Sequence, residues 1–600
     1  MLNPARVSDF SPADFADGEL DLPYYLSHFH RIANAVEMDG PDRGFINISV
    51  WRRPKDNKPH NARIMENILA LAFFYCTDRP WNVFYAQPDL RQRLEAALDF
   101  WCDIQNGDGR FSEYGPGNWN LAATAFATKF MGQTLHLLDS GPAIDSALHE
   151  RVIAADRKAL YATFTIDELQ TQGRNFTNQY ANAWGGALAY LNLFPDAELE
   201  RLLDQRLEES LTEFQSPAGY FYERSGPDWG YFLGTHHSDI HVAYHYARGT
   251  DRASIFLEKE RRWYDWFSYN AVREPDGTGY ALNRGIETRQ QRAFLTEYRA
   301  NLGGAEWSNS GDIDTTALGE ELELPRAYGR TAEAHARDIA DARARLEANW
   351  PAVAPLQVGE FWAFTPYAFL HRDHITWYPT LEQKKAATAM LPYIARDHFT
   401  HQRVDSRHPV VFTFVRRPTY YAAFNTGPVL SAQQRYGLGL LWHPRAGAVL
   451  QSQTDTDHAA WGTVVNHTLC EKADIAAVFR INGNPIIPRP GIRDLPDGDL
   501  EITYPLGESG SKTILFASDA ITVSVHYPGA FTEVLPLLKG DMDRIENGAV
   551  LTRGDVSLCI ETENALTFSE TDLKSGDRQV VTARIDAENT LTYRIARFGE

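Results

Sequence analysis

Hydrophobic positions in the first 350 residues recur at intervals of three and four, a spacing typical of helices that bury one side. Six segments show this pattern: 62–75, 90–105, 120–138, 147–164, 197–214 and 331–350. Several are hydrophobic around more than one stripe, as expected for helices packed against neighbours on both sides. The pattern therefore predicts an N-terminal helical domain over residues 1–350.

The pattern changes after Trp350-Pro351 to short runs that are rich in β-branched and aromatic residues. Gly, Asp, Asn and Pro separate these runs, as is typical of antiparallel strands; they cover 410–425, 436–443, 476–481, 500–506, 512–528 and 578–585. We expect a C-terminal antiparallel β-sandwich over residues 351–600. A helical half followed by a strand-rich half indicates two domains rather than one alternating fold.

Two segments of the helical half repeat one another. Gln105–Trp119 and Gln215–Trp229 align at Gln, Gly, Phe, Glu, Gly-Pro and Trp with a single insertion. Each follows a predicted helix and leads to another, so they suggest helical hairpins arranged in a closed or arched ring, an (α/α) toroid. Equivalent loops would then meet at one end of the ring. The alternative is that Gly-Pro-x-Trp is only a recurrent packing corner.

Composition narrows the classes of partner. The formal net charge of −21 argues against nucleic acid, which is bound by clustered Lys and Arg. It does not exclude an acidic substrate, because local cations can outweigh a distant net charge. Aromatic residues make up 12% of the chain, which fits either a large core or flat rings presented to a sugar. The four cysteines form no CxxC motif, so a disulfide framework or a structural zinc site is not expected.

Targeting segments are not apparent from the sequence. No run approaches the ~20 apolar residues of a membrane span, and the first residues, MLNPARVSDF, lack the hydrophobic stretch of a signal peptide. We therefore expect a soluble, cytoplasmic protein without a membrane partner, unless a leader was trimmed from the sequence.

Amide side chains gather in the segment 174–191. Asn175, Asn178 and Gln179 are followed by Tyr180 and Trp184 at helical spacing. An amide can neutralise a carboxylate or a developing oxyanion without adding a proton source. Asn178 as an ordinary helix N-cap is the alternative.

The second copy of the repeat holds candidate acids and bases. Tyr222, Glu223, Asp228 and Tyr231 lie within it or directly after it, and His236 and His237 follow. His237, His241 and His245 are spaced four apart, but no acidic ligand is fixed by this spacing, so a metal is not indicated.

Two arginines, Arg284 and Arg289, lie in the Gly-containing loop 279–289. The fork of a guanidinium fits a carboxylate geometrically. Arginines on solvated faces are the common alternative. In the strand-rich half, Arg435, Tyr436 and His443 are candidates for a wall of the same site, although a strand Tyr usually packs.

These motifs resemble those of polysaccharide lyases built on an (α/α) toroid with a C-terminal β-sandwich. This group includes hyaluronate, chondroitin AC and xanthan lyases, and the heparinase II/III and alginate lyase relatives. NQYANAWG (178–185) is similar to their Asn- and aromatic-rich helix, and GYFYERSGPDWGYFLG (219–234) to their segment leading to the catalytic Tyr. NRGIETR (283–289) is similar to their Arg loop.

The resemblance implies β-elimination from a uronic-acid-containing poly- or oligosaccharide, without a cofactor. Asn178 would neutralise the uronate carboxylate, Tyr231 would act as the acid, with its role as the base left open, and Arg284 would assist. The related loop carries a His near the position of Arg224, so His236 or His237 would replace that base, or Tyr would act alone. The expected substrate contacts are Trp119, Asn175, Gln179, Tyr180, Tyr222, Glu223, Asp228, Trp229, Arg289 and Tyr436.

Two other functions remain open at this point. Glu113, Glu223 and Asp228 could serve a toroidal glycoside hydrolase, which needs a pair of carboxyl groups. A non-catalytic glycan-binding protein could use Trp119 and Trp229 as stacking platforms. The sequence does not decide the uronate and its linkage, endo or exo action, or the oligomeric state.

Overall fold

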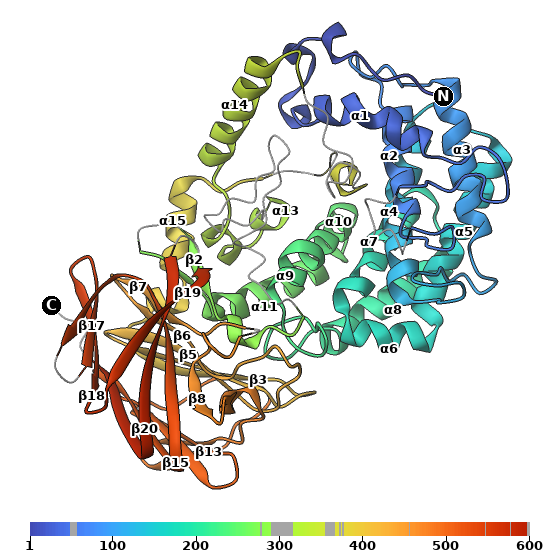
Figure 1. The fold of residues 1–600 in the computed structure, drawn as a ribbon. Coiled ribbons are helices and arrows are strands. Elements are labelled where there is room, and N and C mark those ends of the chain that lie inside the picture. Colours follow the sequence, from blue (N-terminus) through green and yellow to red (C-terminus); the bar gives the residue numbers. More distant parts are fainter. Residues whose placement is uncertain are drawn as a thin grey trace.

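The computed structural model describes residues 1–48, 57–275, 279–289, 316–353, 366–370, 372, 374, 377–454, 456–545, 548–575 and 578–596. Helical hairpins follow a curved path, and a sheet-rich domain adjoins one end of it (Figure 1). The predicted architecture, an (α/α) toroid followed by an antiparallel β-sandwich, is confirmed.

Successive helices alternate between two layers. One layer packs α2 (Ile68–Cys76), α4 (Leu121–Ser140), α7 (Thr177–Leu193) and α10 (His237–Ala247) side by side, and the other packs α3 (Pro88–Asp103), α5 (Ser146–Thr165), α8 (Ala197–Glu213) and α11 (Ala253–Asn270). Each helix of the first layer forms a hairpin with the next one of the second. The remaining described α-helices are α1 (Leu22–Asn34), α6 (Asp167–Asn175), α9 (Trp229–Tyr231), α13 (Thr316–Gly319), α14 (Ala332–Asn349), α15 (Leu381–Ala389) and α16 (Pro392–Ala395).

Small residues allow α4 and α7 to approach closely. A Cβ atom on Gly186 would lie 2.5 Å from Thr128 Oγ1, and one on Gly132 would lie 2.9 Å from the Cβ of Ala189. Interiors are packed too densely to absorb such overlaps. Gly132 of α4 and Gly186 of α7 thus allow the close packing that positions the helix that carries Asn178.

The predicted repeat is visible in the hydrogen bonds of the two loops. The side chain of Gln105 donates to the carbonyl of Gly109 at 3.1 Å and to a carbonyl of α5 at 2.8 Å. Gln215 donates in the same way to Gly219 at 2.8 Å and to a carbonyl of α11 at 2.9 Å. Both glycines have positive φ, +98° and +118°, which only Gly adopts readily. The loops are therefore equivalent and lie at the same end of their hairpins.

The C-terminal domain is a network of antiparallel strands from β3 to β20 that folds back on itself. Its longest pair is β15 with β20, joined from Ala520↔Ala596 to Leu538↔Val580 with one bulge. A two-stranded hairpin, β1–β2, precedes it. The strands are β1 (Ala271–Arg273), β2 (Tyr280–Leu282), β3 (Phe399–Val404), β4 (Val411–Arg417), β5 (Tyr420–Thr426), β6 (Gly437–His443), β7 (Gly447–Gln451), β8 (Gly462–Val465), β9 (Thr468–Leu469), β10 (Val478–Ile481), β11 (Asn484–Ile486), β12 (Gly491–Asp494), β13 (Leu500–Leu506), β14 (Gly510–Phe516), β15 (Ala520–Leu538), β16 (Asp541–Ile545), β17 (Gly548–Arg553), β18 (Val556–Thr562), β19 (Leu566–Ser575) and β20 (Arg578–Ala596). Helices α15 and α16 thus lie between residue 350, the expected domain boundary, and the first strand of this network.

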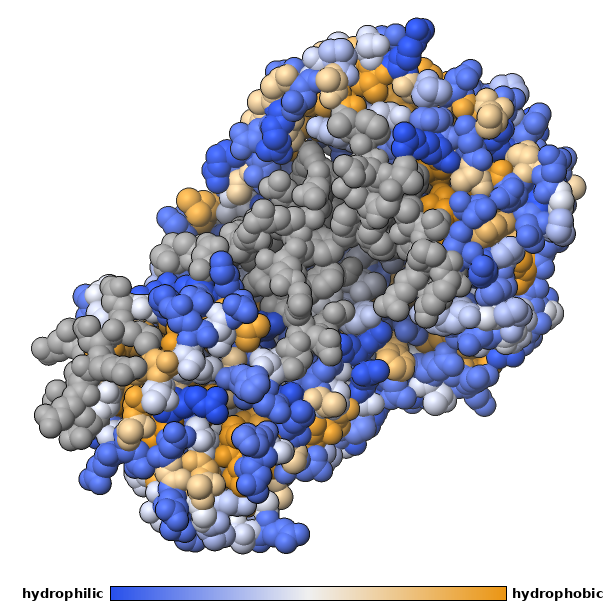
Figure 2. All heavy atoms as spheres, in the orientation of Figure 1, coloured by the Kyte–Doolittle hydropathy of each residue, from blue (hydrophilic) through white to orange (hydrophobic). Residues whose placement is uncertain are grey.

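One hydrophobic cluster joins the two domains. Trp266 of α11 and Tyr220 of the loop between α8 and α9 both contact Phe412 of β4. Their ring centroids lie 6.0 and 5.7 Å from that of Phe412. Strands β4, β5 and β6 are buried along their whole length, because one face covers the sandwich core and the other meets the helices. A large apolar interface of this kind holds domains in a fixed relation. On the face shown in Figure 2, hydrophilic and hydrophobic residues are interspersed over both domains.

Candidate functional site

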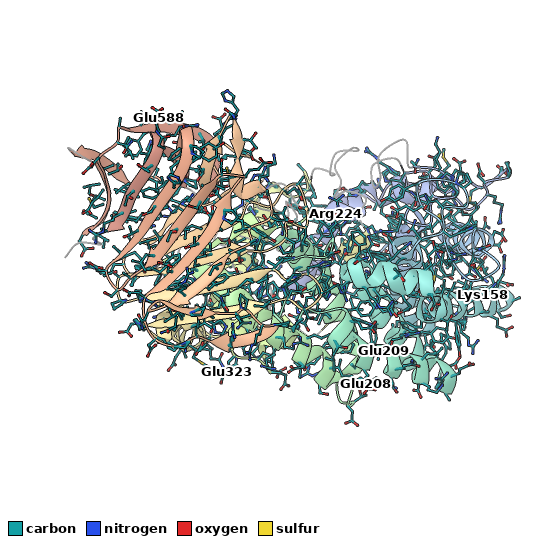
Figure 3. The ribbon with its side chains drawn as sticks, turned by 90° about the horizontal axis from the view of Figure 1, so that it is seen from below. Lys158, Glu208, Glu209, Arg224, Glu323 and Glu588 are labelled. Atoms are coloured by element: carbon teal, nitrogen blue, oxygen red, sulfur yellow. The ribbon has the colours of Figure 1, made fainter. Side chains whose placement is uncertain are left out.

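The candidate site lies where the loop between α8 and α9 meets the start of α7 and the segment 284–289. The backbone N–H of Thr177 donates to the carbonyl of Tyr222 at 3.1 Å, which joins α7 to this loop. Arg224, an exposed residue of the loop, lies between the sheet-rich domain and the helices (Figure 3). The site is therefore built at the junction of the two domains.

Glu223 is the centre of this arrangement. One of its carboxyl oxygens accepts from the backbone N–H of Asn178 at 3.1 Å, and the other pairs with the guanidinium of Arg289. The side chain is 2% exposed. Burial raises the pKa of Glu223 to about 8, and Arg289 and the Asn178 N–H oppose this rise without cancelling it.

Tyr231 is held from two directions. Asp228 caps the short helix α9 by accepting from the Tyr231 N–H at 3.0 Å, and its other oxygen accepts from the Arg289 N–H at 2.8 Å. The guanidinium carbon of Arg289 lies 3.5 Å from the centroid of the Tyr231 ring and 5.1 Å from that of Phe176. The phenol is half-buried, so a cation lies against the face of a ring that retains access to solvent.

Asn178 lies in the first turn of α7 and is 2% exposed. Its side-chain oxygen has no hydrogen-bond partner among the residues that the structure describes. Its carbonyl accepts from the side chain of Asn182 at 2.7 Å, and Asn182 also donates to Asp239. A buried amide oxygen without a partner is uncommon, so Asn178 is a candidate for a contact with a ligand.

The sequence-predicted residues that the structure brings together are thus five: Asn178, Glu223, Asp228, Tyr231 and Arg289. Asn175 adjoins them, because Ser225 donates to its side-chain oxygen at 3.3 Å. Gln179 and Trp119 are half-buried, Trp119 at the end of the equivalent loop of the first repeat.

No protein-family model matches the sequence, and no curated protein matches it. Among solved structures, a heparinase III gene product with methylated lysines is similar with a TM-score of 0.52 and 9% identity, covering 100% of this chain and 87% of that one. The chondroitin AC lyase of Streptomyces coelicolor A3 in complex with chondroitin sulphate has a TM-score of 0.46 and 14% identity, and the match covers 100% of this chain and 81% of that one. Heparan sulfate lyase HepC from Pedobacter heparinus has a TM-score of 0.45 and 10% identity, and the match covers 90% of this chain and 77% of that one.

The chain has a fold similar to that of heparinase III. The resemblance that the motifs predicted is confirmed at the level of the fold. The roles of individual residues rest on the geometry of the site itself.

The two histidines proposed as bases face the protein interior. His236 is fully buried and stacks on Phe221 with ring centroids 3.8 Å apart, and burial lowers its pKa well below the usual value. His237 is 2% exposed, and its Nδ1 lies 3.2 Å from the carboxyl of Glu260 on α11. Neither imidazole lies beside the phenol of Tyr231 in the contacts described above, so the structure gives the expected base role no support.

Other expected contacts serve packing between elements. Trp229 stacks on Trp266 and donates to the carbonyl of Asn283 at 3.1 Å, and Arg284 donates to Gln453 of the sandwich at 2.7 Å. Residues with buried side chains and a partner inside the protein are Tyr180 (with Gln170), Tyr222 (with Asp405), Arg435 (with Asp457), Tyr436 (with the Pro428 carbonyl) and His443 (with the Arg445 and Ala446 N–H groups).

Sequence reasoning missed the residues that hold the site from neighbouring segments. Gln433, in the loop between β5 and β6, donates to the carbonyl of Arg289 at 2.8 Å. Thr288 donates to the carbonyls of Glu223 and Pro227. Thr288 stood inside the recognised Arg loop, whereas no sequence signal links Gln433 to a segment so far away in the chain.

The described residues contain no group of three or more His, Cys, Asp or Glu side chains that could hold a metal ion. In the same part of the chain, no helix is long and apolar enough to cross a membrane.

Proposed function

We propose that this protein is a lyase that cleaves a uronic-acid-containing poly- or oligosaccharide by β-elimination. The observation that carries the proposal is the Tyr231 phenol held against the Arg289 guanidinium, which pairs with the carboxyl of Glu223, itself bonded to the backbone N–H of Asn178. The similarity of fold to heparinase III supports the same class of reaction.

The proposed reaction uses Tyr231 as base and then as acid. Tyr231 in its phenolate form takes the proton from C5 of the uronate. The electrons of the broken C5–H bond form a C4=C5 double bond, the C4–O bond breaks, and the leaving oxygen takes the proton back from Tyr231. The phenolate is thereby restored, and no water is consumed. Proton transfer by a positioned group of this kind contributes roughly 10²–10⁴-fold in rate.

The substrate carboxylate must be neutralised before its C5 proton becomes acidic. We assign this task to the side-chain amide of Asn178 and to the guanidinium of Arg289, whose flat fork fits a carboxylate. Arg289 replaces Arg284 in this role, because Arg284 is buried and donates to Gln453. Charge on the phenolate would lie directly beneath the Arg289 cation.

The hydrolase alternative has less support in the geometry. Hydrolysis needs two carboxyl groups across the scissile bond with one free to act as an acid and the other as base or nucleophile. Asp228 uses both oxygens on backbone N–H groups, and Glu223 is paired with Arg289. Glu113, its counterpart in the first repeat, is 1% exposed.

Ultraviolet absorbance during incubation with a panel of polyuronides and their oligomers tests the proposal. The panel comprises alginate, glucuronan, hyaluronan, chondroitin, and heparin-like and ulvan-like chains. The conjugated double bond of an elimination product absorbs, so rising absorbance on a member is expected and identifies the substrate class. New reducing ends without absorbance would instead support hydrolysis and contradict the proposal.

A further inference from the structure

The turn between β3 and β4, residues 405–410, contacts three helical segments around the site. This turn lies more than 170 residues beyond Tyr231 in the chain. Asp405, at its start, is fully buried. Its carboxyl is divided between the two domains, because one oxygen accepts from the His408 N–H at 2.5 Å and the other faces the helical domain.

The Asp405 oxygen that faces the helical domain receives two hydroxyl groups. Tyr222 donates to it at 2.7 Å, and Ser216 donates to the same atom. Both belong to the loop that carries Glu223 and leads to Tyr231. Hydrogen bonds to a charged acceptor in a buried place are among the strongest that a protein forms.

Arg407 of the same turn holds the neighbouring segments. Its guanidinium donates to the carbonyl of Arg174, at the end of α6, at 2.7 Å and to the carbonyl of Glu213, the last residue of α8, at 2.5 Å. It also lies over the ring of Tyr222, 4.1 Å from the centroid. One side chain thus satisfies carbonyl groups at two helix ends, which otherwise lack partners within the helix.

The backbone of Tyr222 extends this contact to the catalytic groups. Its carbonyl accepts from the N–H and from the hydroxyl of Thr177, each at 3.1 Å. The next residue in the loop, Glu223, accepts from the N–H of Asn178, the residue after Thr177. A shift of Tyr222 would therefore displace both the loop that carries Glu223 and the start of α7, which carries Asn178.

We propose that the β3–β4 turn is a positioning clamp, in which Asp405 and Arg407 of the sandwich hold the two segments that carry Asn178 and Tyr231 in register. Asp405, Arg407 and Tyr222 are then positioning residues, and the sandwich sets the geometry of a site whose reacting groups come from the helical domain. The catalytic consequence rests on the proposed function. A displacement of about 1 Å at a reacting group can cost on the order of 100-fold in rate.

Asp405→Asn and Tyr222→Phe test the clamp with little change in shape. We expect kcat to fall about 10- to 100-fold in Asp405→Asn and less in Tyr222→Phe, with KM within about threefold, because the groups that bind substrate are kept. Glu274→Gln is the matched control. Glu274 joins the β1–β2 hairpin to the sandwich by pairing with Arg553, at 3.0 Å, and with Arg578. The substitution Glu274→Gln therefore weakens the domain interface at a different set of strands.

Hydrogen–deuterium exchange supplies a readout that does not depend on activity. Amides of residues 174–180 and 214–232 should exchange faster in Asp405→Asn and in Tyr222→Phe, and at the wild-type rate in Glu274→Gln. Unchanged exchange in these two segments would overturn the clamp. The clamp would also be overturned if Asp405→Asn and Glu274→Gln lost the same stability and the same kcat. If the wild-type protein eliminates no polyuronide, the proposed function fails, and the exchange data still decide the clamp.

Discussion

The guanidinium of Arg289 lies over the ring of Tyr231, with its central carbon 3.5 Å from the ring centroid. The same guanidinium pairs with Glu223, whose other oxygen accepts from the N–H of Asn178. These contacts join three segments of the chain in one small cluster. A phenol and a cation thus lie together beside Asn178, the residue whose side-chain amide we propose as the neutraliser of the uronate carboxylate.

Tyr231→Phe should strongly reduce turnover while leaving affinity nearly intact. Only the hydroxyl is lost, so the expected decrease in kcat is roughly 10²–10⁴-fold, and the dissociation constant for an oligosaccharide should change by less than about threefold. Initial rates and calorimetric titration measure the two quantities. Tyr85→Phe, at a tyrosine that is 37% exposed in the loop before α3, is the matched control. Full activity in Tyr231→Phe would remove Tyr231 from the mechanism.

Arg289→Lys should lower kcat/KM about 100-fold, although the charge is kept. An ammonium group can neither hold a carboxylate with two parallel hydrogen bonds nor lie flat on a ring. Arg284→Lys should mainly reduce stability, because Arg284 contacts Gln453 rather than the phenol. Steady-state kinetics and thermal unfolding of both variants check this. A larger loss of kcat/KM in Arg284→Lys than in Arg289→Lys would show that Arg284 binds the substrate carboxylate.

Glu223→Gln should weaken the dependence of stability on pH. The folded-state pKa of about 8 lies above the ordinary value of 4.5, so between these values the folded protein holds a proton that the unfolded chain has released. The free energy of unfolding therefore falls as the pH rises from 4.5 through 8, by up to about 1.4 kcal/mol per pH unit. Denaturant unfolding at several pH values should show a smaller fall in the variant. Parallel curves for the two proteins would show that Glu223 is already ionised at low pH.

His236→Phe should retain kcat within about threefold. The ring is fully buried against Phe221, and phenylalanine preserves this stacking. Rates measured from pH 5 to 8, with circular dichroism to confirm folding, check the expectation. A folded variant with a loss above 100-fold would restore His236 as the base.

The fold could be predicted from the sequence because its patterns are local. Three- and four-residue spacing placed the helices, and β-branched runs bounded by Gly and Pro placed strands such as β13, which matches residues 500–506. The repeat placed two equivalent loops, since Gln105 and Gln215 make the same hydrogen bonds.

The site could be predicted only in part. Asn178, Glu223, Asp228, Tyr231 and Arg289 could be named as candidates because they stand in short motifs, and the structure places them in one cluster. The motifs did not show which side chains turn inward: Trp229 and His236 lie within five residues of Tyr231 in the sequence, yet both are buried against other aromatic rings. Asp405 was missed because its contact with Tyr222 spans 183 residues, and no local pattern records such a pairing.

Counting double bonds and new reducing ends in the same reaction tests the central claim most directly. The substrate is the member of the polyuronide panel that is cleaved fastest, and wild-type protein is compared with Tyr231→Phe. We predict one ultraviolet-absorbing end for every new reducing end in the wild type, and formation of both products at least about 100-fold more slowly in the variant. Reducing ends that form without absorbance, or equal rates in the two proteins, would contradict elimination by Tyr231.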